Sequence, residues 1–134
     1  MRRGTLFGLV LVLGLVAASC GGSDEGGTIT IDGQSANDHG SKDVKGESSI
    51  EFEMDDFYFN PTVLQSTAGE TITLEVTNEG ENEHSFTSDG LGVDEEVEAG
   101  GTATIEITFP DSGQVEFHCK YHADKGMRGA VEVA

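Results

Sequence analysis

The sequence predicts an all-β domain, a sandwich or barrel of short strands, and two patterns carry this prediction. From Ser49 onward, apolar and polar residues alternate with a period of two in several separate runs, as in strands with one buried and one solvated face. Clusters rich in Gly, Asn, Asp and Pro separate these runs, and no convincing amphipathic helix lies among them. Short alternating strands with frequent turns are typical of β-sandwiches and barrels.

The predicted strands follow one another in a simple order. In the first, Ile50, Phe52 and Met54 alternate with acidic residues, so we assign Met54 to the core. The apolar members of the later runs are Ile72, Leu74 and Val76; Ala103, Ile105, Ile107 and Phe109; Val115, Phe117 and Cys119; and Val131 and Val133. Turns are expected at 68–70, 78–80, 99–101 and 110–113. Residues 49–134, about 86 in all, are enough for a small sandwich core.

Residues 1–19 have the features of an export signal peptide. Arg2 and Arg3 precede an apolar run at 6–16, which is shorter than the ~20 apolar residues of a membrane span. Small residues then lead into Cys20, which resembles a bacterial lipobox, where the cysteine carries lipid. We therefore expect a periplasmic or cell-surface protein anchored to the membrane through Cys20. The alternative is an ordinary cleaved signal followed by an incidental cysteine.

Residues 20–48 are interpreted as the lipidated cysteine and a flexible polar linker. Gly, Ser and Asp dominate this segment and apolar residues are few, so it offers little to a core. Residues 28–31 could form a short strand, but the composition gives this little weight. His39 lies in the linker and is assigned no role.

The chain is strongly acidic. It has 25 acidic against 7 basic residues, a formal charge of −18, and loss of Arg2 and Arg3 with the signal would leave five basic residues and a charge of −20. This surface argues against nucleic acid or anionic lipid headgroups as partners. It is compatible with a basic protein partner, a salty habitat or simply a solvated surface. Within 49–134 the basic residues are Lys120, Lys125 and Arg128, all in or just after the segment 117–127, so that end of the domain is expected to be less negative than the rest.

Residues 117–127 contain three side chains that can bind a metal. A thiol, an imidazole and a thioether, on Cys119, His122 and Met127, lie within nine residues. Cys119 has the inward parity of Phe117, whereas His118 has the opposite parity and is expected to point outward. With Cys20 lipidated, Cys119 has no disulfide partner in the chain, and a free thiol in an oxidising compartment calls for an explanation.

A second imidazole comes from His84, which begins a predicted strand and has the inward parity of Phe86. Two imidazoles and a thiolate with a distant thioether form a blue-copper site. Zinc is the rival metal, but thioether is a poor zinc ligand. Taken singly, Cys119 would be a small core residue, His122 a surface histidine and Met127 core filling. A catalytic copper oxidase would need further cysteine or histidine ligands, so we expect no enzyme activity.

With these four residues, the segment 49–134 resembles the plastocyanin/azurin group of cupredoxins. The resemblance rests on Cys119-x-x-His122-x-x-x-x-Met127, the final strand after it, and the histidine that follows the strand at 71–78. It implies a Greek-key sandwich and one type 1 copper, with Met127 as the weak axial ligand. It also implies a one-electron carrier that shuttles between extracytoplasmic redox proteins, which we expect to be a monomer.

One position departs from this family pattern. Many members have Asn directly after the first histidine, where it braces the ligand loops, and here the residue is Ser85. Two other functions stay open from the residues: a copper carrier or buffer without a redox role, and a β-sandwich interaction domain without metal.

Overall fold

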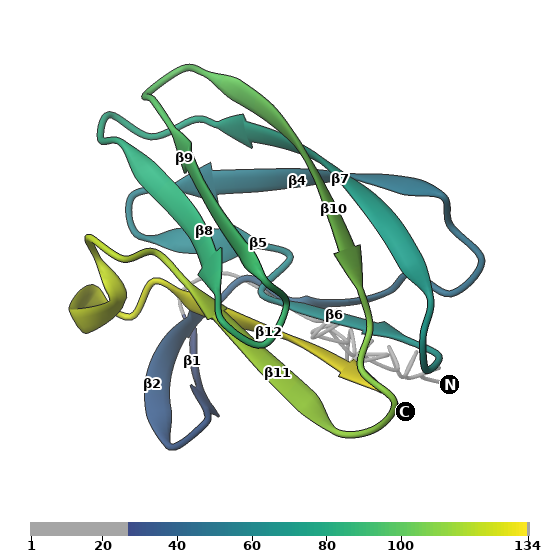
Figure 1. Cartoon of the computed structure of the whole chain (residues 1–134). Coiled ribbons are helices and arrows are strands. Elements are labelled where there is room, and N and C mark those ends of the chain that lie inside the picture. The colour runs from purple at the N-terminus through teal and green to yellow at the C-terminus, as the bar shows by residue number, and fades with distance from the viewer. Residues whose placement is uncertain (1–26, 134) are drawn as a thin grey trace, which may run out of the picture.

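The computed structural model describes residues 27–133, which form two facing β-sheets and a separate hairpin (Figure 1). The strands are β1 (Gly27–Ile31), β2 (Gln34–Asp38), β3 (Ser41–Asp43), β4 (Ser49–Asp55), β5 (Tyr58–Asn60), β6 (Val63–Ser66), β7 (Thr71–Asn78), β8 (His84–Ser88), β9 (Val93–Val97), β10 (Thr102–Thr108), β11 (Gln114–His118) and β12 (Arg128–Val133). A single turn of 3-10 helix, η1 (Ala123–Lys125), lies between β11 and β12.

The two sheets exchange strands along the chain. One has the order β10-β7-β4-β5 and the other the order β3-β6-β12-β11-β8-β9. The chain passes from one sheet to the other between β3 and β4, β5 and β6, β6 and β7, β7 and β8, β9 and β10, and β10 and β11. The all-β Greek-key sandwich expected from the sequence is therefore confirmed.

The buried faces follow the alternation in the sequence. Strand β4 buries Ile50, Phe52 and Met54, as its period of two predicts, and Met54 lies in the core. Between the sheets, four phenylalanine rings pack together, with centroids 4.5 to 6.1 Å apart: Phe52, Phe59, Phe86 and Phe117. Large aromatic side chains stabilise a small core efficiently because each buries much apolar area.

The prediction of a flexible linker is wrong for residues 27–48. Strands β1 and β2 form an antiparallel hairpin, and β3 pairs in parallel with β6. The hairpin turn uses Asp32 and Gly33, both with positive φ, which is the chemistry of a tight two-residue turn. Ile31 and Ala36 bury against Val63 and Ala130. Burying a side chain of the size of Ile31 contributes about 1.5–3 kcal/mol, so a few apolar residues suffice to order the segment.

The predicted signal peptide and Cys20 lie outside the described residues. Within 27–133, no helix has the length and apolar character required to cross a membrane.

Candidate metal centre

His84 and Cys119 come together because their strands are neighbours in one sheet. Strands β8 and β11 are antiparallel, with His118 opposite Thr87, so the beginning of β8 lies beside the end of β11. His84 is the first residue of β8 and Cys119 directly follows β11. Both side chains are buried, as their parity predicted.

The loop from Cys119 to Met127, called the ligand loop below, brings in the other two residues. The His122 N–H donates to the Cys119 carbonyl at 3.2 Å, and the Met127 N–H donates to the His122 carbonyl at 3.3 Å. The Cys119 N–H in turn donates to the Met127 carbonyl at 3.1 Å, which closes the loop at its base. Met127 is fully buried beside Cys119, whereas His122 is partly exposed.

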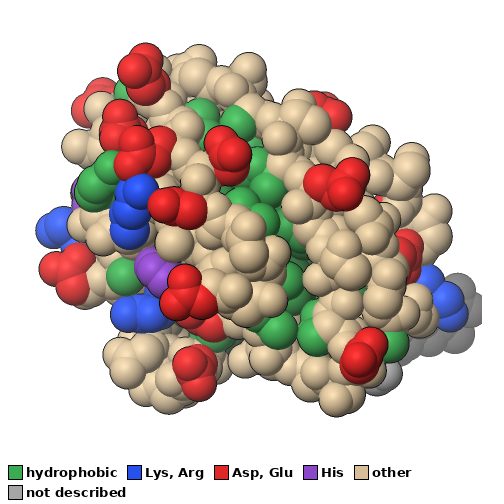
Figure 2. All heavy atoms as spheres, viewed as in Figure 1, with side chains coloured by type: hydrophobic (Ala, Val, Ile, Leu, Met, Phe, Trp, Pro, Cys, Tyr) green, Lys and Arg blue, Asp and Glu red, His purple; other side chains and the backbone are tan. Residues whose placement is uncertain are grey.

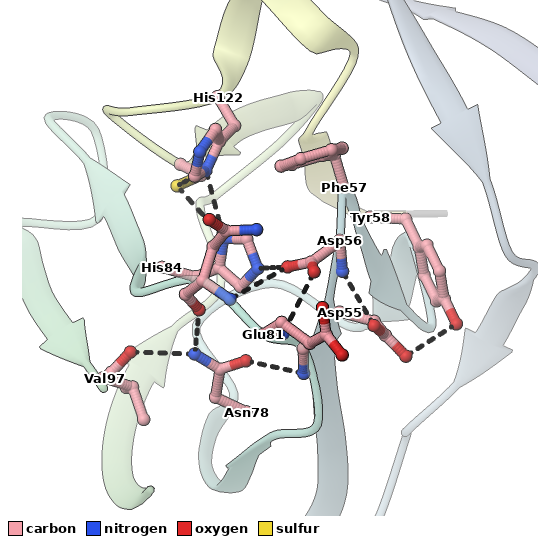
Figure 3. Close-up of polar contacts among 12 residues, drawn as sticks. Asp55, Asp56, Phe57, Tyr58, Asn78, Glu81, His84, Val97 and His122 are labelled. Carbon is pink, nitrogen blue, oxygen red and sulfur yellow. Dashed lines mark hydrogen bonds and ion pairs between the residues drawn. The ribbon is translucent and has the colours of Figure 1, made fainter. Parts of the chain in front are cut away.

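Three donor atoms converge on one point. The Nδ1 atoms of His84 and His122 are 3.2 Å apart, and the Cys119 sulfur lies 3.8 and 3.6 Å from them. All three atoms lie within 4.8 Å of one another. The rings of His84 and His122 meet edge to face beside this point, with centroids 5.0 Å apart (Figure 3). The structure therefore brings His84, Cys119 and His122 together, with Met127 buried next to them.

Hydrogen bonds prepare Cys119 to act as a thiolate. Burial raises the pKa of the thiol, but hydrogen bonds from His84, from the Ser85 N–H at 3.4 Å and from His122 outweigh burial and lower the pKa to about 6. Burial lowers the pKa of His84, while the sulfur of Cys119 and the carboxylate of Asp56 raise it by more, so the pKa of His84 is raised.

Asp56 is a functional residue that the sequence did not reveal. Its Oδ1 lies 2.7 Å from Nε2 of His84 (Figure 3). Without a metal, the charged ring donates from Nε2 to Asp56 and from Nδ1 to Cys119. Once Nδ1 loses its proton, the Asp56 contact keeps the remaining proton on Nε2 and leaves Nδ1 for a metal. The carboxylate also accepts the N–H groups of Glu81 at 3.0 Å and Asn82 at 3.4 Å. Burial raises the pKa of Asp56, but the hydrogen bonds from Glu81 and His84 together lower it by more. The pKa is therefore lowered, and the carboxylate stays ionised.

Ser85 braces the ligand loop by hydrogen bonds, the role expected of the asparagine at this position in the family pattern. Its N–H donates to the Cys119 sulfur, and its Oγ accepts the Lys120 N–H at 2.9 Å. A second contact joins its Oγ to Oγ1 of Thr87, also at 2.9 Å. A serine at this position therefore ties β8 to the ligand loop.

The remaining histidines lie away from the centre. His118 points outward as predicted, where its Nδ1 pairs with a Glu116 oxygen at 2.8 Å. His39 lies between β2 and β3 and not in a linker, and its ring stacks on Tyr58 with centroids 3.4 Å apart.

Basic residues surround the ligand loop, and two of the three are paired. The Lys120 ammonium lies 2.7 Å from Glu96 and 3.1 Å from Asp94, and Arg128 lies 3.4 Å from Glu116. The Lys125 ammonium lies over the Phe57 ring, 5.3 Å from its centroid. Figure 2 shows acidic side chains spread over the face and several basic ones near the end that holds η1.

The donor set fits copper. Soft sulfur ligands and imidazoles arranged in this way suit a type 1 site. Met127, whose side chain is buried and whose carbonyl accepts the Cys119 N–H, adds a thioether to the same loop. The two Nδ1 atoms face the sulfur, and the other nitrogen of His84 is occupied by Asp56, as a metal-binding histidine requires.

Comparisons with known proteins agree with this fold and site. Residues 27–133 match the family described as Cupredoxin-like domain, so the chain belongs to that family. Halocyanin of Natronomonas pharaonis is 36% identical over 84 residues, which cover 58% of this chain and 48% of halocyanin. The chain thus spans about half the length of this curated relative.

Two solved structures share the fold at low identity. Auracyanin from the photosynthetic bacterium Roseiflexus castenholzii has a TM-score of 0.54 at 19% identity, covering 66% of this chain and 98% of auracyanin. The metal-binding domain of the Cu(I)-exporting P-type ATPase of Streptococcus pneumoniae has a TM-score of 0.57 at 17% identity, covering 69% and 96%.

Proposed function

We propose that the protein is a one-electron carrier with a single type 1 copper held by His84, Cys119, His122 and Met127. The convergence of two Nδ1 atoms and the Cys119 sulfur is the observation that carries the proposal. Membership of the Cupredoxin-like family and the 36% identity to halocyanin support the proposal. Bound copper would supply a one-electron couple between Cu(II) and Cu(I).

The chain's own part is to hold the ligands still. His84 and Cys119 are attached to neighbouring strands, and Ser85 and Asp56 fix their orientations by hydrogen bonds. A donor set that changes shape little favours fast electron transfer. His122 is the only one of the four ligands that is not fully buried, so we assign it as the route by which electrons leave. Tyr121, beside it, is 46% exposed and offers a contact surface there.

A copper carrier or buffer is the alternative, and burial argues against it. His84, Cys119 and Met127 are inaccessible to solvent, whereas a protein that hands copper to an acceptor must let the acceptor's ligands reach the metal. Metal exchange separates the two functions. A shuttle keeps its copper through repeated reduction and oxidation, while a carrier loses it to an acceptor chelator. A metal-free interaction domain would bind no copper at all.

The optical spectrum of the copper-loaded protein tests the proposal. We expect an intense blue colour from thiolate-to-copper charge transfer, one copper per chain, and loss of the colour in Cys119→Ser. Met54→Leu is the control, because Met54 is buried in the core and belongs to no ligand set. A colourless protein, or a Cys119→Ser variant with the wild-type spectrum, would contradict the assignment.

The location and partners belong to the same proposal. We propose an exported monomer held at the membrane by lipid on Cys20, exchanging electrons with protein partners outside the cytoplasm. Cys20→Ser should move the protein from the detergent phase to the aqueous phase in a detergent partition experiment. Equal partition of the two forms would leave the electron-carrier role standing and refute the anchor.

A further inference from the structure

Asn37 of β2 joins the N-terminal hairpin to the ligand loop by hydrogen bonds. Its side-chain Nδ2 donates to the Phe57 carbonyl at 2.8 Å and to the Lys125 carbonyl at 3.0 Å. Its backbone N–H donates to the Gly126 carbonyl at 2.9 Å. Both side-chain partners are carbonyl oxygens, so the amide nitrogen must be the atom that faces them.

The two ends of this bridge carry different parts of the metal centre. Lys125 and Gly126 lie between His122 and Met127 in the ligand loop. Phe57 follows Asp56, whose carboxylate holds the His84 ring, and the Phe57 ring lies 4.6 Å from the His122 ring (Figure 3). Asn37 therefore ties the loop that bears one histidine to the turn that supports the other.

The local backbone is built for this close approach. Gly126 has φ of +86°, and a Cβ placed on it would lie 3.0 Å from Oδ1 of Asn37. Any other residue would thus be strained and would crowd the amide. On the other side, Thr62 Oγ1 donates to the Asn37 carbonyl at 3.2 Å, which fixes β2 against the sandwich.

The hairpin itself is firmly attached. Ile31 and Ala36 are buried in a cluster with Val63 and Ala130, so β2 has a rigid base from which Asn37 extends. In Figure 1 the β1–β2 hairpin lies on the side of the sandwich that holds η1 and β12. The side-chain amide of Asn37 therefore holds the Phe57 and Lys125 carbonyls from a segment that is itself packed against the core.

We propose that Asn37 is a positioning residue for the metal centre: its three donated hydrogen bonds hold the ligand loop against the Asp56–Phe57 turn and so fix the distance between the two histidine ligands. This inference rests on the proposed copper function. Without the side-chain bridge, the Phe57 and Lys125 carbonyls bond to water, and the His122–Met127 segment moves more freely relative to His84.

The rival explanation is that Asn37 merely stabilises the hairpin. Two variants separate the explanations. Asn37→Asp keeps the shape but places an oxygen against the carbonyl groups, and Asn37→Ala removes both side-chain donors. Ile31→Val is the matched control, because it loosens the hairpin's packing and leaves all the Asn37 bonds intact. Urea unfolding of the metal-free proteins measures how much stability each variant loses.

Three readouts test the position of the loop. The first is hydrogen exchange at the Cys119 and Met127 amides of the metal-free protein, which we expect to be faster in both Asn37 variants than in Ile31→Val. The second is the electron paramagnetic resonance spectrum of the Cu(II) form, which should change only in the Asn37 variants. The third is transfer of Cu(I) to bicinchoninate, which should be about tenfold faster when two hydrogen bonds are lost.

The outcomes distinguish the two proposals. If wild-type protein binds copper normally and the Asn37 variants match Ile31→Val in all three readouts, the positioning role is refuted and the electron-carrier proposal stands. If wild-type protein binds no copper, the electron-carrier proposal fails, and hydrogen exchange at the Cys119 and Met127 amides still decides whether Asn37 holds the loop. Faster exchange and an altered spectrum in Asn37→Asp, without either in Ile31→Val, support the proposal.

Discussion

The Nε2 atom of His84 lies 2.7 Å from Oδ1 of Asp56, so a carboxylate holds the ring through the nitrogen that does not face Cys119. This contact selects the tautomer in which Nδ1 has a free lone pair and increases the basicity of the ring as a ligand. Asp56 is itself held by the N–H groups of Glu81 and Asn82, so its position does not depend on the metal.

Removing this carboxylate should weaken copper binding. We expect Asp56→Ala to lower the affinity for Cu(II) by about 10- to 100-fold, the usual cost of losing the hydrogen-bond partner of a metal-binding histidine. Competition with a chelator of known affinity measures the change. Glu83→Ala is the matched control, because it removes the same charge from an exposed side chain one residue from His84 that makes no hydrogen bond to the ring. Equal losses in the two variants would show that only charge matters.

The serine at position 85 makes a separate prediction about stability. Ser85→Ala leaves its own N–H bonded to the Cys119 sulfur but removes the acceptor of the Lys120 N–H. An unpaired backbone donor in a part-buried position costs about 1–3 kcal/mol, so the free energy of unfolding should fall by that order. Denaturant unfolding of the metal-free protein provides the measurement.

The control for that variant is Thr87→Val, which removes the hydroxyl contact with Ser85 and an exposed bond to Asp94 at 3.0 Å, and leaves the bond between Ser85 and the Lys120 N–H in place. It should cost less than Ser85→Ala, and Ser85→Asn should restore part of the lost stability, because an amide oxygen can accept the same N–H. If Thr87→Val proves as costly as Ser85→Ala, the bond to Lys120 is not the source of the stability.

Much of the fold and the ligand set could be predicted because both depend on local pattern. Strand parity placed Cys119 inward and His118 outward, and the spacing to His122 and Met127 put one sulfur and one imidazole in the same loop. The alternation in β4 likewise identified Met54 as core.

What was missed depends on contacts between distant segments. Asp56 is one of 25 acidic residues and carries no signal of its own, because only the folded chain shows that it meets His84. Asn37 bonds across 88 residues to Lys125, which no local pattern reports. The hairpin that carries Asn37 did leave a signal, Asp32-Gly33 between residues of high β propensity, but the polar composition around it outweighed that signal.

A carboxylate cluster away from the metal centre predicts a dependence of stability on pH. Burial raises the pKa of Glu53 from 4.5 to about 7, and Glu79 and Asp55 nearby raise it as well. Because the folded state binds this proton more tightly than the unfolded state, the stabilising contribution is full below pH 4.5 and is lost as the pH rises through 7. Glu53→Gln should therefore raise the melting temperature at pH 8 by roughly 2–5 °C and have little effect at pH 4.

Glu51→Gln is the control for this prediction, since it removes the same charge from an exposed position two residues earlier on β4. The difference between the two variants should widen from pH 4 to pH 8, as measured by thermal unfolding in buffers of equal ionic strength. A gain that is constant with pH, or the same in both variants, would mean that general charge repulsion and not the proton on Glu53 is responsible.

The basic residues around the ligand loop should govern how charged reactants approach. Lys125 lies over the Phe57 ring, which contacts His122, the assigned exit for electrons. Lys45 lies just before the beginning of β4, whereas the metal centre lies near the other end of that strand. Charges more than about 10 Å apart are screened at 0.1 M salt, so of these two lysines only Lys125 should influence a reaction at His122 under these conditions.

Oxidation of the reduced protein by ferricyanide, an anionic oxidant, tests this idea. Lys125→Gln should slow the reaction about twofold or more at low salt, and the difference should vanish as salt increases, because one favourable charge has been lost at the exit. Lys45→Gln removes the same charge at the far end and should react like wild-type protein at 0.1 M salt. If both variants slow the reaction equally, net charge alone steers the oxidant, and the basic residues beside the ligand loop have no local role.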